Sequence, residues 1–297
     1  MLVYPPGSSD PIRGDLLGRV VLRTDLTPVP STVEIEFRPD KTTSAIVVGA
    51  TVKVGPSALE YLIVRVQSPQ DGAPIQGGRR LPHVRAIGLL ASCAAIANPL
   101  QRAVIKEGAT LGEIYRACGA QVRIDSDFNV PQFSAFVGMT PSYAIAQVLQ
   151  EEAGALVCSG ARIQFRRLLE LRDAKAARVV DDDICEKVES DLLERLAIPF
   201  GVSTSPDAGF VVGRRAEARR AQYRPRADLR ILNNLGTVLT ARRKLRGILA
   251  TEFNAGTRFD VGGLRLIVIT AAHVAERDEG AGSMQAYSQF WLGEVVQ

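Results

Sequence analysis

Few residues of this chain combine the type and spacing that an enzyme active site requires. The two histidines, His83 and His273, lie in apolar stretches typical of strands, where a histidine is usually packed and hydrogen-bonded rather than catalytic. The sequence contains no HExxH, GxSxG, P-loop or GxGxxG motif. Its four cysteines include no CxxC pair, which argues against a zinc site.

Three adjacent carboxyl groups, Asp181, Asp182 and Asp183, are the best candidates for acid–base or Mg²⁺ chemistry. A catalytic pair of carboxyl groups needs burial, because burial separates the two into an acid and a base. These three residues stand in a polar stretch instead, so a solvated loop is the favoured interpretation. We therefore predict that the chain is not an enzyme and that it needs no metal and no cofactor.

Two oppositely charged segments follow each other in the second half of the chain. The acidic stretch runs from Asp181 to Glu194, and the basic run from Arg214 to Arg246 holds ten Arg and one Lys. The basic run could contact phosphates, could pair with the acidic stretch of the same or a neighbouring subunit, or could be a solvated face. Tyr223 is its only aromatic residue, too few for base stacking. We favour charge pairing between subunits, with the candidate interface residues Asp181, Asp182, Asp183, Arg214, Arg215, Arg219 and Arg220.

The whole composition is that of an ordinary folded protein. The 297 residues are 46% hydrophobic and 23% charged, and a net charge of +4 does not by itself imply a nucleic-acid partner. The N-terminus lacks the pattern of a signal peptide, and no apolar run approaches the roughly 20 residues of a membrane span. We expect free, buried thiols in a reducing cytoplasm, which the protein leaves only as part of a particle.

The elements that must position these residues are mostly short strands. Residues 32–37 alternate between apolar and polar side chains, which is the signature of a half-buried strand. Residues 1–15 have the composition of an extended arm. Further strands are predicted over residues 20–22, 44–54, 61–67, 80–90, 263–274 and 284–296. Many short strands separated by Pro and Gly favour a small barrel or sandwich.

A different pattern of residue types predicts a small α/β module over residues 106–167. Thr110 and Glu113 have the spacing of a capping box, and Gly119 ends the helix that they begin. Thr140-Pro141 starts a second helix, and Ser159-Gly160 is typical of a hairpin turn. A short strand over residues 121–125 lies between the helices. The predicted domains are residues 1–105, a first β-barrel with an N-terminal arm; 106–175, an α/β insertion; and 176–297, a second β-barrel.

The order of these parts resembles the baseplate hub proteins of contractile-tailed phages, including the late-control family and the spike-carrying hub of type VI secretion. Residues 110–120 (TLGEIYRACGA) look like the family's first insertion helix, and residues 139–154 (MTPSYAIAQVLQEEAG) resemble its second. The hairpin that follows ends in an aromatic residue, here Phe165. Residues 259–273 (FDVGGLRLIVITAAH) look like the closing strand, which the strand over residues 285–292 completes as a hairpin. We expect the spike to be a separate protein, because the sequence contains no long β-helical segment like the fused needle of the type VI form.

The resemblance implies an α+β, β-rich fold with two tube-like β-barrel domains and a small α/β insertion. It implies a homotrimer that joins the hexameric tail tube protein to a separate, central trimeric spike protein and contacts other baseplate proteins. Such a hub works in the virion, at the tail baseplate, after assembly in the host cytoplasm, with no membrane partner. DNA passes its lumen without specific binding, so we expect the basic run to avoid the lumen wall.

Three other functions remain open on the sequence alone. The same barrel could belong to a tube or tube-initiator component, in which case a hexamer is expected. The basic run could instead make the chain a nucleic-acid-binding module, whose DNA affinity would fall steeply with salt. A hydrolase with an unrecognised carboxylate site at Asp181 to Asp183 is a further alternative, and substitution of these residues without loss of any measured activity would count against it.

Overall fold

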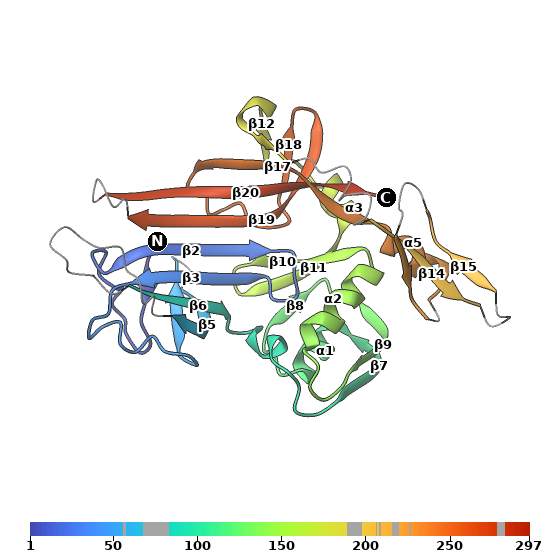
Figure 1. Ribbon diagram of the computed structural model, residues 1–297, viewed down its shortest axis with the longest axis horizontal. Helices are drawn as coiled ribbons and strands as arrows, with labels where there is room; N and C mark the ends of the chain where they lie inside the picture. The colour runs from blue at the N-terminus through green and yellow to red at the C-terminus, as the bar shows by residue number, and fades with distance from the viewer. Residues whose placement is uncertain are drawn as a thin grey trace.

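The computed structural model confirms that the chain is β-rich with short helices. It describes residues 1–55, 58–67, 83–188, 198–205, 207, 209–215, 220–225, 227–277 and 283–297. Figure 1 shows three parts: long strands across the upper and left side, a compact α/β module below them, and a small lobe at the right-hand end.

Twelve of the described strands form one large mixed sheet. Its path runs β1-β4-β5-β6-β3-β2-β19-β20-β17-β13, with β12 and β18 attached beside β19. The N-terminal strands are β1 (Val3–Tyr4), β2 (Leu17–Asp25), β3 (Ser31–Phe37), β4 (Thr51–Val54), β5 (Leu59–Gln67) and β6 (Val84–Leu90). The C-terminal ones are β12 (Arg178–Val180), β13 (Glu186–Lys187), β17 (Val238–Ile248), β18 (Arg258–Val261), β19 (Leu264–Arg277) and β20 (Met284–Val296). The described strands form no closed barrel, so the two-barrel architecture stays a prediction.

The sheet joins the two ends of the chain. Strand β2 pairs antiparallel with β19, from Asp25 opposite Thr270 to Arg19 opposite Glu276. Ala255 donates its backbone N–H to the Thr24 hydroxyl over 3.0 Å, which adds a buried link between the same two parts. Residues far apart in sequence therefore depend on each other for their backbone hydrogen bonds.

Strand β3 shows how the sequence pattern sets the buried face. Val33, Ile35 and Phe37 are buried, whereas the side chains between them are only partly covered, as the alternation predicts. The predicted strand over residues 44–54 was too long, because only β4 is extended. Thr43 explains the difference: its hydroxyl accepts from the Asp40 N–H over 2.8 Å and donates to the Arg38 carbonyl over 3.0 Å. These bonds hold the preceding segment in a turn.

The insertion module contains the predicted helices and hairpin. In α1 (Leu111–Ala117), the Thr110 hydroxyl accepts from the Glu113 N–H, and Glu113 accepts from the Thr110 N–H, so the capping box is confirmed. Helix α2 (Pro141–Glu151) begins with proline, although the Thr140 hydroxyl makes no cap bond. The hairpin of β10 (Gly154–Ser159) and β11 (Arg162–Arg167) pairs with β8 (Arg123–Asp125). Strands β7 (Val104–Thr110) and β9 (Asn129–Ala135) and helix α3 (Leu168–Asp173) were not predicted.

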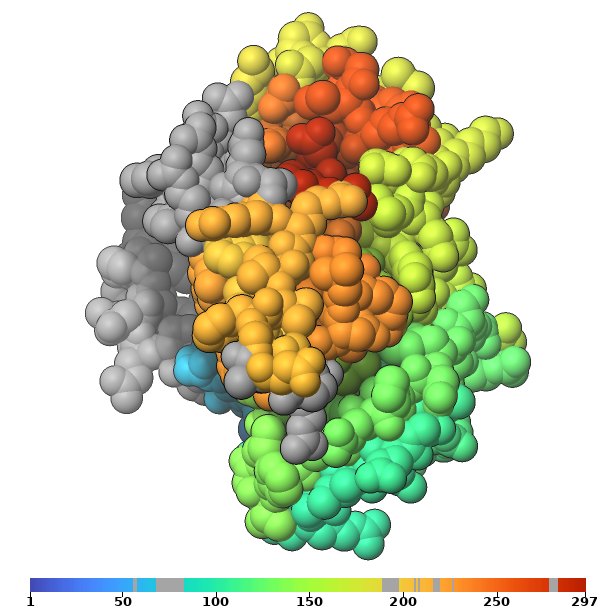
Figure 2. Space-filling model, turned by 90° about the vertical axis from the view of Figure 1, so that its right-hand side faces the viewer, coloured from blue at the N-terminus to red at the C-terminus, as the bar shows by residue number. Residues whose placement is uncertain are grey.

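The lobe is a three-stranded sheet with one helix. It consists of β14 (Pro199–Thr204), β15 (Phe210–Val212), β16 (Arg220–Tyr223) and α5 (Leu229–Leu235), with β14 in the centre. Figure 2, which views the molecule from its right-hand side, shows the lobe standing out toward the viewer.

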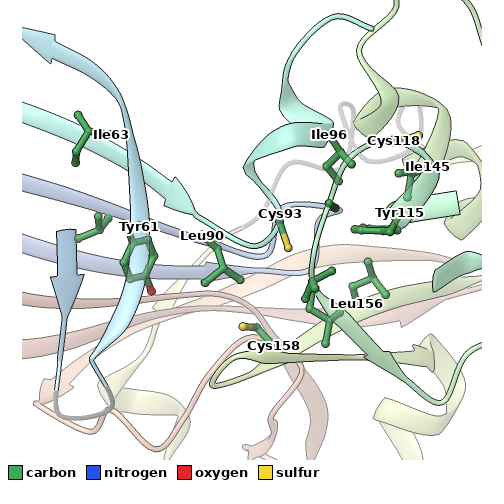
Figure 3. Close-up of a cluster of buried hydrophobic side chains, with 14 of the residues drawn as sticks. Tyr61, Ile63, Leu90, Cys93, Ile96, Tyr115, Cys118, Ile145, Leu156 and Cys158 are labelled. Atoms are coloured by element: carbon green, nitrogen blue, oxygen red, sulfur yellow. The ribbon is translucent and has the colours of Figure 1, made fainter. Parts of the chain in front are cut away.

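One hydrophobic core spans the N-terminal strands and the insertion module. Tyr61 from the sheet, Tyr115 from α1 and Leu156 from the hairpin are all fully buried in it (Figure 3). The Tyr115 hydroxyl donates to the Pro28 carbonyl over 2.8 Å, across 87 residues of sequence. A second core lies under the C-terminal strands, where Phe259 and Phe290 meet edge to face at 5.4 Å.

Candidate assembly surfaces

The candidate catalytic groups are engaged in the fold. His273 of β19 is fully buried, and its Nδ1 lies 2.8 Å from the Ser288 hydroxyl, which also accepts from the Ala250 N–H. Burial lowers the pKa of His273, so the ring is neutral near pH 7. The packed, hydrogen-bonded role predicted for this histidine is confirmed.

The four cysteines are free and buried, as predicted. Burial raises the pKa of Cys93 to about 12 and those of Cys118 and Cys158 to about 11. Thiols with such values are protonated at neutral pH and are poor nucleophiles. No group of three or more His, Cys, Asp or Glu within the described ranges could hold a metal ion.

Asp181 directly precedes a short 3₁₀ turn, η2 (Asp182–Ile184), and Asp182 and Asp183 are the first two residues of that turn. Asp182 is bound by the guanidinium of Arg243, whose side chain is only 10% exposed. Hydrogen bonding from Arg243 lowers the pKa of Asp182. Asp181 and Asp183 are exposed and leave their carboxylates to solvent. The three carboxyl groups thus differ in environment, and among the described residues Asp182 alone of the three forms an ion pair within the chain.

Much of the basic run is neutralised within the same chain. Lys244 lies 3.0 Å from Glu186 of the acidic stretch, and Arg243 binds Asp182, so acidic–basic pairing occurs between β17 and the η2–β13 segment. Other members of the run bind carboxylates elsewhere: Arg224 binds Glu151, Arg230 binds Glu152 at 2.8 Å, and Arg242 binds Glu294 at 3.1 Å. These pairs reduce the charge available to a phosphate backbone.

The remaining predicted interface arginines belong to the lobe. Arg214 donates its backbone N–H to Asn233 over 2.7 Å, and the guanidinium of Arg215 lies 5.1 Å from the centre of the Phe200 ring. Arg220 begins β16 and is exposed. Arg219 lies outside the described residues. The aspartates and these arginines thus occupy different elements of the fold.

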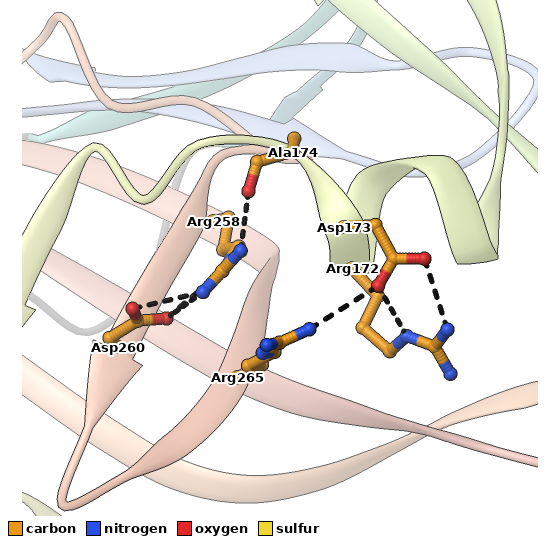
Figure 4. A network of polar contacts seen from close by, with 6 residues as sticks. All are labelled: Arg172, Asp173, Ala174, Arg258, Asp260 and Arg265. Carbon is orange, nitrogen blue, oxygen red and sulfur yellow. Dashed lines mark hydrogen bonds and ion pairs between the residues drawn. The ribbon is translucent and has the colours of Figure 1, made fainter.

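Further ion pairs fix α3 to the C-terminal strands. Arg258 holds Asp260 at 2.7 Å and donates to the Ala174 carbonyl, while Arg265 approaches Asp173 at 3.6 Å (Figure 4). Hydrogen bonding from Arg172 lowers the pKa of Asp173. The contacts of Arg258 with Ala174 and of Arg265 with Asp173 hold α3 against the C-terminal strands. The carboxylates of Asp173 and Asp260 are thus engaged in ion pairs with arginines.

The lobe carries an apolar sheet face that sequence reasoning missed. Phe210 is 77% exposed, Tyr223 is 56% exposed and Val212 is 46% exposed. In residues 199–204, Phe200 and Val202 alternate with Gly201 and Ser203, and this pattern could have identified strand β14. The exposure of the apolar face depends on which face α5 covers, and this cannot be read from the sequence.

A further property of the described chain concerns its helices. None of those in the described ranges has the length and hydropathy that crossing a bilayer requires.

Comparison with solved structures identifies the fold. The structure superposes on a tail protein from Neisseria meningitidis MC58 with a TM-score of 0.63 at 12% identity, over 99% of this chain and 95% of that one. The 43 kDa tail protein of prophage MuSo2 from Shewanella oneidensis gives 0.62 at 11%, over 100% and 98%. The fold of this chain is that of phage tail proteins.

A type VI secretion component from E. coli, described as structurally similar to tail proteins of bacteriophage T4, gives 0.57 at 10% identity. That match covers 100% of this chain and 77% of the E. coli protein. No family model and no curated protein matches the sequence. The similarity is therefore one of fold. It extends over 99–100% of this chain, whereas the sequence identity is only 10–12%.

Proposed function

We propose that the chain is a structural baseplate hub of a contractile phage tail. In this role it is a homotrimer that joins the hexameric tail tube to the central trimeric spike. The observation that carries the proposal is the match to tail proteins over essentially the whole of both chains. The likeness to a type VI secretion component supports a place near the spike, because that component is described as structurally similar to the T4 tail proteins gp27 and gp5.

The arrangement of charged groups supports an assembly role rather than catalysis. His273 and Asp182 hold neighbouring elements together, and the buried thiols are protonated. A hub needs rigid strands and complementary surfaces and no cofactor. In this proposal the protein acts in the virion, at the tail baseplate, and DNA passes its lumen without specific binding.

Native mass and partner binding test the proposal. The purified chain is measured by light scattering at moderate salt and then mixed with the tube and spike proteins encoded with it. A mass of about three times 32.0 kDa, with both proteins bound at once, is expected. A hexamer would instead indicate a tube component. A species that retains DNA at high salt would contradict the absence of specific DNA binding.

A further inference from the structure

The two faces of the lobe sheet have opposite environments. The face that carries Gly201 and Gly213 is covered by α5: a Cβ atom at either glycine would lie 2.6 to 2.7 Å from the Leu232 carbonyl oxygen. Ser203, on the same face, is fully buried. The missing side chains let the α5 backbone approach the strands closely.

The opposite face has no covering element among the described residues. The strand register brings six aromatic and aliphatic side chains onto it together with Thr204, because residues opposite each other in a sheet share a face. We call these six side chains the lobe face: Phe200, Val202, Phe210, Val212, Ala221 and Tyr223. Arg215 stacks over Phe200 at its rim. Arg220 is opposite Pro199 in the register, so its side chain belongs to the other face of the sheet. The lobe face is thus an aromatic and aliphatic surface with positive charge at its edge.

A second exposed surface has the complementary character. Val179 of β12 is 79% exposed, and Ile184 of η2 is 59% exposed. Between them in the sequence stand the exposed carboxylates of Asp181 and Asp183. We call these four residues the acidic corner. Strand β12 lies at the top of the molecule in Figure 1, away from the tip of the lobe at the right.

We propose that the lobe face of one subunit binds the acidic corner of a second copy of this chain. Apolar side chains meet at the centre, and Arg215 meets Asp181 and Asp183 at the rim. Two lobe faces brought together would oppose arginine with arginine, and two acidic corners would oppose aspartate with aspartate. Charge therefore favours a head-to-tail contact over a two-fold one.

A head-to-tail contact has a structural consequence that rests on the proposed function. Heterologous interfaces form a ring when the rotation between copies closes, and a trimer closes after three identical steps. Six side chains are fewer than the roughly 20–30 residues on each side of a standard interface. The contact thus serves to choose the neighbour and its register, while further surface adds affinity.

Crosslinking between two single-cysteine variants tests the contact. The native thiols are buried, so a cysteine placed on the surface is the main site open to a thiol reagent. We mix Phe210→Cys chains with Ile184→Cys chains, add a short bifunctional thiol reagent, and expect a crosslinked dimer in the mixture but not in either variant alone. Tyr143→Cys mixed with Ile184→Cys is the matched control, because Tyr143 is a 74% exposed aromatic outside both surfaces.

Sedimentation over a concentration series gives an independent measure. Phe210→Ser and Asp183→Arg should each raise the concentration at which trimers dissociate by about tenfold or more. The exposed-site controls Tyr143→Ser and Glu107→Arg should leave it unchanged.

The outcomes separate the contact from the proposed function. Wild-type trimers with no mixed crosslink, and with no effect of either substitution, would overturn the contact and leave the hub intact. Crosslinks within Phe210→Cys alone would show pairing of two lobe faces and would also overturn it. A wild-type chain that stays monomeric at every concentration would contradict both.

Discussion

Buried polar side chains tie distant segments of this protein together one residue at a time. Tyr115, His273 and Ser31 each reach a partner from another strand or loop while excluded from water. A buried polar group that loses its partner costs more than the bond itself contributed, because the partner stays desolvated. Single atoms at these positions therefore have measurable effects on stability.

The hydroxyl of Tyr115 provides a first prediction. Tyr115→Phe removes the donor to the Pro28 carbonyl and leaves that buried oxygen without this bond, so the free energy of unfolding should fall by about 1–2 kcal/mol. Urea unfolding followed by circular dichroism measures the change. Tyr143→Phe removes a hydroxyl from a 74% exposed side chain and should have no effect. Equal destabilisation by both substitutions would contradict the assigned role of the Pro28 bond.

The buried imidazole of His273 predicts a pH dependence. Its pKa is lowered by burial from 6.5, so the unfolded chain takes up the proton more readily than the folded one. The free energy of unfolding should therefore decrease as the pH falls from 6.5 toward the folded pKa. The carboxylates of Asp173 and Asp182, whose pKa values are lowered from 3.8, contribute only at more acidic pH.

Substitution separates the contribution of His273 from that of other groups. His273→Asn keeps a polar atom near Ser288 but does not titrate, so the decrease in stability from about pH 7.5 to about pH 5.5 should become shallower. His83→Asn, at a half-buried position outside the core, should keep the wild-type slope. Parallel pH profiles for wild type and His273→Asn would show that the proton is taken up elsewhere.

At the scale of elements, a pair of carboxylates at the end of α2 connects the insertion to the lobe. Glu152 is 8% exposed and accepts from Arg167 at 3.0 Å and from Arg230 at 2.8 Å. The carbonyl of Glu151 accepts from the Asn234 side chain of α5. This connection fixes the lobe, and with it the lobe face, relative to the rest of the subunit.

Removal of the buried charge should loosen the lobe. Glu152→Gln leaves two half-exposed guanidinium groups with a weaker acceptor, and we expect a loss of about 1–2 kcal/mol. Amide hydrogen exchange should accelerate in the described lobe residues more than in β2 or β19. Glu60→Gln, at an exposed carboxylate 3.7 Å from Lys53, is the control and should change neither quantity.

Local sequence signals predicted those elements whose boundaries are set locally. The capping box at Thr110, the proline start of α2 and the hairpin turn at Gly160 depend on a few neighbouring residues, and all three are present. Strands β7 and β9 were missed because neither has the alternating apolar pattern of a half-buried strand. They pair only with each other, β9 contains Pro131, and β7 has mostly exposed side chains. Propensity carries little information in such strands.

The candidate surfaces were only partly predictable for a related reason. Charge blocks are visible in a sequence, so pairing between the acidic stretch and the basic run could be predicted, although the individual pairs Asp182–Arg243 and Glu186–Lys244 could not. Which members stay exposed depends on tertiary contacts: Arg224 and Arg230 reach α2, whereas Arg215 and Arg220 remain on the lobe. The lobe face follows from α5 packing on the opposite side, which leaves no local signature.

At the scale of the whole molecule, the N-terminal segment depends on the rest of the chain. Residues 1–105 were predicted as a domain, and in the structure their core is shared with Tyr115, Leu156 and Phe165 of the insertion. Strand β2 also takes its backbone partners from β19. Arg277 donates to the Gly14 carbonyl over 2.7 Å at the far end of the same pairing.

This dependence leads to a prediction about a fragment. A chain of residues 1–105 alone would expose the edge of β2 and the apolar side chains that contact Tyr115 and Leu156, so it should not fold cooperatively. Circular dichroism over a urea series should show no sigmoidal transition for the fragment, while the full chain unfolds with one in the same buffer. A cooperative transition in the fragment would establish an autonomous first domain. Its absence would mean that the two ends of the chain must meet before the subunit can offer any surface to a neighbour.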